Sequence, residues 1–158
     1  MKIPIIIALV LTASSFSMAQ FATANHAVTV QVATITGLQI SAGSVTLNIA
    51  SASAVAGQDI MSVSDQSTSL LWGTNSSSRK ITINSSLVAP TFTLNALALN
   101  PTQGLSAAEA TLSSTPVDFL LNIGRSLGSC SIRYTGIALA SQGTGTDSHT
   151  ITFTIQTQ

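Results

Sequence analysis

The sequence predicts an all-β protein: a single antiparallel β-sandwich of roughly seven to nine short strands behind an N-terminal export signal. Three observations support this fold class. Apolar and polar residues alternate along most of the chain, which is the period of a half-buried strand. Short runs of glycine, serine, asparagine and proline separate the alternating segments. Only 6% of residues are charged, against roughly 25% in ordinary globular proteins, so uncharged polar side chains must form the surface.

The N-terminus has the features of a secretory signal peptide. Lys2 precedes an apolar run over residues 3–13, which is too short to span a membrane. Ser17-Met18-Ala19 matches a small-x-small cleavage site, and Ala22-Thr23-Ala24 offers a second one. We therefore expect export, with the mature protein secreted, at the cell surface or in the periplasm.

This signal divides the chain into two expected parts. Residues 1–19 are the signal peptide, and residues 20–158 form one β-sandwich domain, because they contain no fixed-period repeat and no second composition block. The second part also contains no stretch long and apolar enough to span a membrane.

The first strands are expected close to the start of the mature chain. Ala27–Thr34 places three valines on one face, and the glycine at position 37 predicts a bend after it. Residues 45–49 alternate again and predict another strand. Further short strands are expected over residues 60–63, 79–84 and 91–99, with loops over residues 65–69 and 75–78.

One segment favours a helix. Leu105–Leu112 is rich in alanine, and Ser106 and Glu109 have the spacing of a capping box. So short a helix needs packing against the rest of the protein to be stable.

The C-terminal part predicts three strands. Val117–Ile123 places alternate apolar residues on one face, and Gly124–Gly128 is expected to be a connection. Cys130–Tyr134 and His149–Ile155 also alternate, and residues 136–145 between them are rich in turn residues. We expect these last two segments to pair as an antiparallel hairpin.

The charge content excludes one class of partner. The formal net charge of the chain is zero, and its few basic residues form no cluster. Nucleic-acid binding requires a patch of lysine and arginine, so no nucleic-acid partner is expected.

No catalytic constellation is recognisable. The G-x-S-x-G motif of serine hydrolases is absent, and the similar letters in residues 123–128 are interpreted as a connector. The five acidic residues show no preferred pair for glycoside hydrolysis. We therefore expect a protein that is not an enzyme and needs no cofactor.

Metal binding is not expected either. His26, His149 and Cys130 lack the short spacings of a zinc site. Three aspartates in polar segments are interpreted as ordinary turn residues: Asp59, Asp65 and Asp147.

Two single residues leave alternatives open. Trp72 is the only candidate for ligand binding, as a platform for stacking a sugar, but its apolar neighbours favour packing in the core. Cys130 is the only cysteine and cannot form an intramolecular disulfide. Its phase with Ile132 favours a buried small hydrophobe over a reactive thiol or an intermolecular bridge.

The mature chain loosely resembles bacterial secreted immunoglobulin-like and pilin-like β-sandwich proteins. The resemblance rests on the Ser17-Met18-Ala19 export signal, the valines of the opening strand and the alternation of His149–Ile155. It implies an immunoglobulin-like sandwich and assigns no functional residue.

Two functions from different classes follow from these observations. The first is a non-catalytic structural or adhesive protein of the cell surface, such as a fibre subunit, which self-associates or joins other envelope proteins by strand addition. The alternative is a carbohydrate-binding module of the cell envelope, which would depend on Trp72 and the polar loops.

The export signal generates a first prediction. Expression of the whole chain with export should yield a mature protein that begins next to Ala19, because signal peptidase cleaves after a small-x-small site. N-terminal sequencing of the exported protein tests this expectation. A secreted chain that still begins at Met1 would contradict it.

Overall fold

The computed structural model describes residues 24–41 and 43–158. The predicted signal peptide lies outside these residues. The chain divides into two units, of which the second is Ala33–Gln158. Residues 24–32 belong to the first unit and contain no secondary structure.

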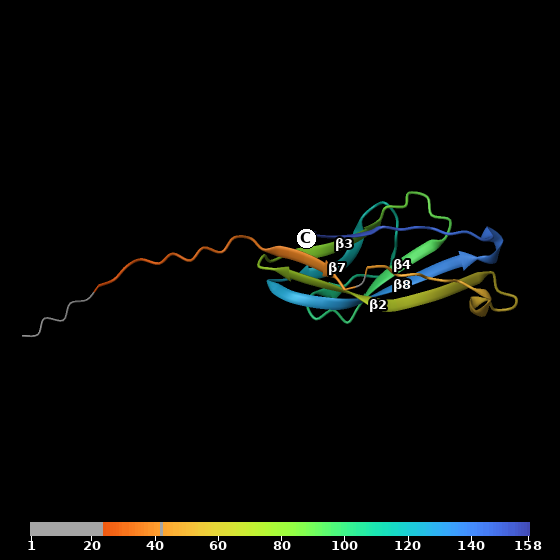
Figure 1. Cartoon of the computed structure of the whole chain (residues 1–158), viewed down its shortest axis with the longest axis horizontal. Coiled ribbons are helices and arrows are strands. Elements are labelled where there is room, and N and C mark those ends of the chain that lie inside the picture. Colours follow the sequence, from red (N-terminus) through yellow and green to blue (C-terminus); the bar gives the residue numbers. More distant parts are fainter. Residues whose placement is uncertain (1–23, 42) are drawn as a thin grey trace, which may run out of the picture. The chain divides into compact units, whose positions relative to one another are not determined.

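The second unit is all-β, as predicted, and consists of two antiparallel sheets (Figure 1). The first sheet has the strand order β1-β2-β8-β4-β6, and the second has the order β5-β7-β3-β9. The nine strands of the described chain are β1 Thr36–Ile40, β2 Ile60–Thr74, β3 Arg79–Ser85, β4 Thr93–Leu99, β5 Leu105–Ser106, β6 Ala110–Thr111, β7 Val117–Ile123, β8 Ser126–Leu139 and β9 Ile151–Thr157. Two short 3-10 turns occur as well, η1 Ser51–Ser53 and η2 Ala140–Gln142.

Side chains from both sheets form one continuous buried core. The first sheet contributes Leu70 and Ile132, and the second contributes Ile83 and Phe119, all of them almost completely buried. Phe119 also packs edge-to-face against Phe153, with ring centroids 5.3 Å apart. The core lies between the strands that the alternating pattern predicts, because a period of two turns every second side chain inward.

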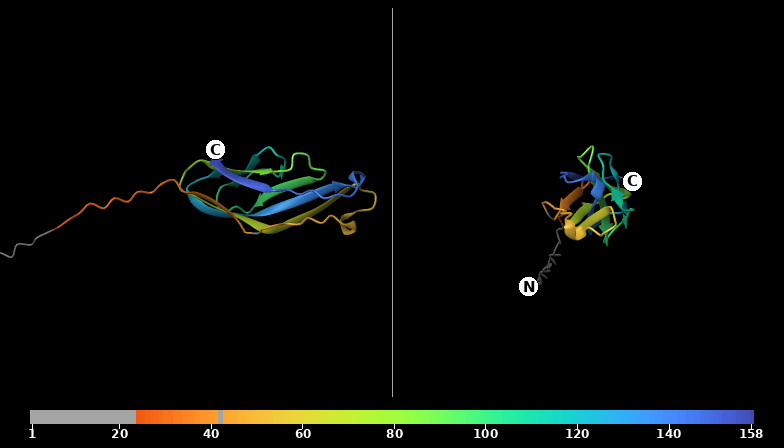
Figure 2. Two further views of the ribbon diagram at one scale, coloured as in Figure 1. Left: turned by 45° about the horizontal axis from the view of Figure 1, so that its top comes forward. Right: turned by 90° about the vertical axis from the view of Figure 1, so that its right-hand side faces the viewer.

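The longest pairing joins β2 to β8, which lie side by side in Figures 1 and 2. The strand expected over residues 60–63 forms but is longer than predicted, and the loop expected over residues 65–69 is wrong, because both segments belong to β2. The pairing shifts its register between Asp65 and Thr68, where a β-bulge accommodates the turn-forming residues within the strand. Asp65 Oδ1 accepts hydrogen bonds from Ser67 N and Ser67 Oγ, at 2.9 and 2.6 Å.

The predicted C-terminal hairpin is also wrong. Cys130–Tyr134 lies in β8 of the first sheet, whereas Ile151–Thr157 pairs with β3 in the second. β8 extends to Leu139 and has β2 and β4 as neighbours on its two edges, so no edge is left for β9. The chain turns at η2 and crosses to the other sheet.

Two predicted strands near the N-terminus do not form. Ala27–Thr34 has no partner strand, and Val28, Val30 and Val32 are exposed by 73%, 84% and 71%. Residues 45–49 keep the expected alternation of half-buried and exposed side chains but belong to neither sheet. Alternation describes which side chains turn inward, and a strand additionally needs a neighbouring edge for its main chain.

The predicted helix over Leu105–Leu112 is replaced by β5, β6 and the link between them. Ser106 Oγ donates to the Ala98 carbonyl instead of capping a helix, and Glu109 pairs with Arg133 at 3.1 Å. Ala107 N donates to the carbonyl of Phe119 in β7. Bonds to neighbouring strands thus replace those of a short helix that needed packing to form.

The face predicted for Val117–Ile123 is partly wrong. Leu120 is fully buried and Leu121 only half-buried, because the β3–β7 pairing contains two register shifts. The expected connection over Gly124–Gly128 is shorter than predicted, since β8 already begins at Ser126.

The packing of Trp72 on Gly128 generates a second prediction. A Cβ atom on Gly128 would overlap the Trp72 ring, whereas one on Gly124 would meet no atom within 4 Å. Gly128→Ala should therefore lower the free energy of unfolding by about 1–3 kcal/mol, the usual cost of overpacking. Gly124→Ala is the matched control and should change it little. Urea unfolding measures both, and equal midpoints for the two variants would contradict the prediction.

Candidate functional site

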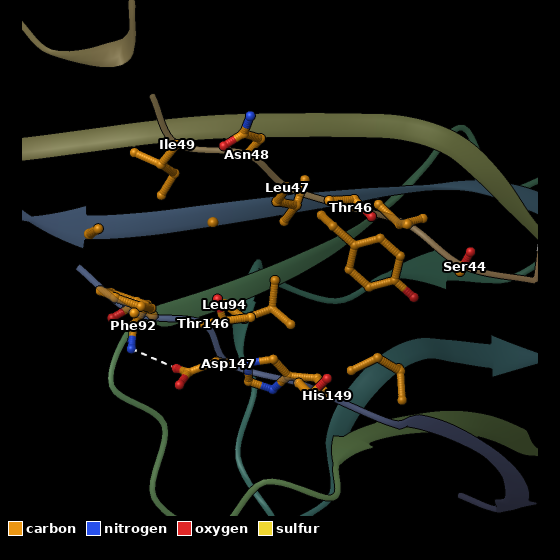
Figure 3. A pocket seen from close by; sticks show the side chains of 18 of the residues that line it. Ser44, Thr46, Leu47, Asn48, Ile49, Phe92, Leu94, Thr146, Asp147 and His149 are labelled. Carbon is orange, nitrogen blue, oxygen red and sulfur yellow. Dashed lines mark hydrogen bonds between the residues drawn. The ribbon is translucent and has the colours of Figure 1, made fainter. Parts of the chain in front are cut away.

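The strongest candidate site is a groove in the second unit with a volume of about 1120 Å³ (Figure 3). Residues 43–51 form one rim, and residues 143–151 form the other. We call this feature the strap groove, because neither rim belongs to a sheet until β9 begins at Ile151.

The first rim is an extended chain with one apolar side. Val45, Leu47 and Ile49 are half-buried, and the residues between them are exposed. Leu47 and Ile49 point into the groove in Figure 3, while Asn48 points away from it. No strand covers this main chain among the described residues, so the rim is held chiefly by its side chains.

The floor of the groove combines large and small side chains. Tyr134, Gly136 and Ala138 follow one another on the inward face of β8, and Met61 and Leu94 lie beside them. A Cβ atom on Gly136 would lie 3.3 Å from Leu47 Cδ1. The glycine therefore allows the first rim to approach β8 closely.

The second rim continues the inward face of β9 with polar residues. Asp147 and His149 are half-buried, in phase with the apolar side chains of β9. Asp147 Oδ2 accepts a hydrogen bond of 2.8 Å from Phe92 N, and His149 Nδ1 lies 2.8 Å from Ser85 Oγ. These two contacts fix the rim to the ends of β3 and β4.

Ser85 and His149 are residue types that can act as nucleophile and base, but here their contacts hold the second rim in place. Ser85 is 1% exposed, and its Oγ also accepts a hydrogen bond from Leu87 N. The nearby Asp147 carboxylate binds Phe92 N. No sequence pattern indicates this pair, because 64 positions separate the two residues.

One polar atom at the groove has no partner. Thr68 lines the groove and is 3% exposed, and its Oγ1 makes no hydrogen bond to the described part of the chain. A buried hydroxyl without a partner costs free energy, so this position favours an occupant that can hydrogen-bond.

The structure places the single candidate for sugar stacking in the core. Trp72 is 4% exposed and packs on Gly128 across the β2–β8 pair. Its ring therefore offers no free face to a ligand. Cys130 is likewise buried and lies on the same face of β8 as Ile132 and Tyr134.

The aspartates interpreted as turn residues each accept a backbone hydrogen bond. Asp59 accepts from Ser141 N at 3.1 Å. The hydroxyl of Ser67, followed by its backbone N–H, lowers the pKa of Asp65 below its ordinary value. In the described residues, no three histidine, cysteine or acidic side chains gather as a metal site would require.

The comparisons with known proteins return nothing: no family model, curated protein or solved structure matches the chain. Within residues 24–41 and 43–158, no helix has the length and apolar character needed to cross a membrane.

The two buried titratable groups of β8 generate a third prediction. Burial raises the pKa of the Cys130 thiol from 9.0 to about 11. Burial, followed by the nearby Cys130, raises the pKa of Tyr134 from 10.0 to about 12. Above pH 9 the unfolded chain loses these protons while the folded chain keeps them, so the free energy of unfolding should fall as the pH rises from 9 to 12.

Urea unfolding at several alkaline pH values measures this slope. Cys130→Ala should reduce the slope between pH 9 and pH 11, because it removes one of the two titrating groups. A slope that is identical in the wild type and the variant would contradict the prediction.

Proposed function

We propose that this protein is an exported, non-catalytic structural protein of the cell surface that self-associates by strand addition. In this proposal residues 1–19 are a signal peptide, and the two sheets form an immunoglobulin-like sandwich. The single observation that supports it best is the state of Ala27–Thr34. This segment has the pattern of a strand but no partner strand, and its three valines are 71–84% exposed.

Such a segment is unfavourable in water and favourable in a sheet. Packing exposed β-branched side chains on a partner removes apolar surface from water. This stabilises the complex by about 25 cal/mol per Å² of buried apolar surface. The segment contains no charged residue and no proline, which natural proteins place on edges to prevent pairing.

The second unit offers an edge of the same kind. β9 lies at the end of its sheet and pairs only with β3. Its sequence, Ile151–Thr157, also lacks charge and proline. Main-chain hydrogen bonds to such an edge provide affinity, and alternate side chains provide specificity.

The carbohydrate-binding alternative depended on Trp72, whose ring is enclosed by the core. The strap groove is lined by few aromatic side chains that could stack on a sugar, namely Phe92, Tyr134 and Phe153. No specific contact of the groove favours this alternative over strand addition.

Self-association generates a fourth prediction. The exported protein should form oligomers whose mass increases with protein concentration, measured by light scattering with size-exclusion chromatography. Deletion of residues 24–32 should abolish the oligomers and leave a folded monomer, because Ala33–Gln158 has its own core. Circular dichroism checks the fold of the deletion variant. A full chain that remains monomeric at high concentration would overturn the proposed function.

A further inference from the structure

We infer that the strap groove is the acceptor site for strand addition and that its occupant is Ala27–Thr34 of a second copy of this chain. The inference rests on the proposed function and adds the location of the site and the identity of the partner segment.

The groove lies where each sheet contains a strand that is paired on one edge only. In the first sheet β1 covers β2 only over Leu70–Thr74, so the remainder of β2 has a strand on one edge alone. In the second sheet β9 has a strand on one edge, and residues 143–149 before it have none. An extended segment in the groove would therefore find unpaired main chain beside it.

The shape and chemistry of the groove suit a valine-bearing strand. Met61 and Leu94 are half-buried apolar side chains on the floor, on which the valines of an incoming segment can pack. Among the described residues that line the groove, Asp147 is the single carboxylate, and it already accepts a hydrogen bond from Phe92 N. An uncharged segment with valines on one face can enter without burying an unpaired charge.

The length of the segment matches the groove. Eight residues of extended strand span about 26 Å, at roughly 3.3 Å per residue. The first rim, residues 43–51, has one residue more, and its side chains over residues 45–49 alternate with the period of an extended chain. Thr68 Oγ1, buried at the groove without a partner, can bond to the main chain or to a polar side chain of the incoming segment.

Several features favour a second copy over the segment of the same chain. Asn75 holds the chain where the segment ends, since its Oδ1 accepts from Ile35 N and its Nδ2 donates to the Ala33 carbonyl, at 2.8 and 2.7 Å. Met61 and Thr68 of β2 line the groove, whereas Asn75 follows the C-terminal end of that strand, so the chain's own Ala33 is held away from the groove.

Photo-crosslinking of the exported full chain tests the site. Val30 is replaced by a diazirine-bearing amino acid, and after irradiation the crosslinked peptides are identified by mass spectrometry. We expect adducts in the dimeric and larger species, on the groove floor at Met61, Leu94 and Ala138. The same photoreactive group at Thr29, on the opposite face of the segment, is the matched control and should give few of these adducts.

Two charge substitutions test the face of the segment. Val30→Asp should weaken assembly at least about tenfold, because its carboxylate would be buried without a partner. Thr29→Asp adds the same charge on the other face and should leave most of the assembly intact. Equal effects of the two substitutions would overturn the inference.

The outcomes separate the inference from the proposed function. Oligomers with crosslinks on surfaces outside the groove, such as those around Val88 or Leu127, would overturn the inference and leave strand addition standing. Groove crosslinks confined to the monomer, with a yield independent of concentration, would identify the chain's own segment as the occupant and overturn the second-copy assignment. Absence of any oligomer would overturn the proposed function and the inference with it.

Discussion

The pairing of β2 with β8 is the constraint on which the rest of this structure depends. It is the longest ladder of the second unit, and both strands contribute alternate side chains to the core. At one end Trp72 lies on Gly128, so the largest side chain of the core packs directly on the main chain of its neighbour. Because β4 occupies the other edge of β8, the chain after Leu139 cannot return along β8, and it crosses to the second sheet.

That departure determines where the candidate site lies. The chain crosses from η2 to β9, and residues 143–150 connect the two sheets without a strand of their own. On the opposite rim, residues 43–51 follow β1 and lead into η1, and they too pair with no strand. The groove is thus the space between a connection within the first sheet and a crossing to the second sheet. Main chain on both rims has hydrogen-bonding capacity that the sheets do not use.

Most charged residues in the described part of the chain make contacts within the protein, and they are absent from Ala27–Thr34 and β9. Most aspartates and both described salt bridges serve local contacts: Asp65 closes the bulge, Asp147 fastens a rim, and Lys80 pairs with Asp118 at 2.7 Å. Neither β9 nor Ala27–Thr34 carries a charge that would oppose pairing with another chain. Strand edges without such protection promote aggregation of a monomer, whereas in an assembly they allow neighbouring chains to pair.

The sequence by itself determined the all-β class of the protein and the inward face of most strands. The alternation of Cys130, Ile132 and Tyr134 predicts the buried face of β8, and the apolar neighbours of Trp72 favour the place in the core that it occupies. These properties are local, because the direction of a side chain in a strand depends on the period of the chain alone.

Only the tertiary structure decided which segments pair. Cys130–Tyr134 and His149–Ile155 alternate equally well, yet they belong to different sheets, and residues 45–49 alternate without joining either. Main-chain pairing depends on which edges remain free after the longest ladder has formed, and this is a property of the whole unit. The strap groove and the contact of Ser85 with His149 arise from that global arrangement, since residues far apart in sequence create them.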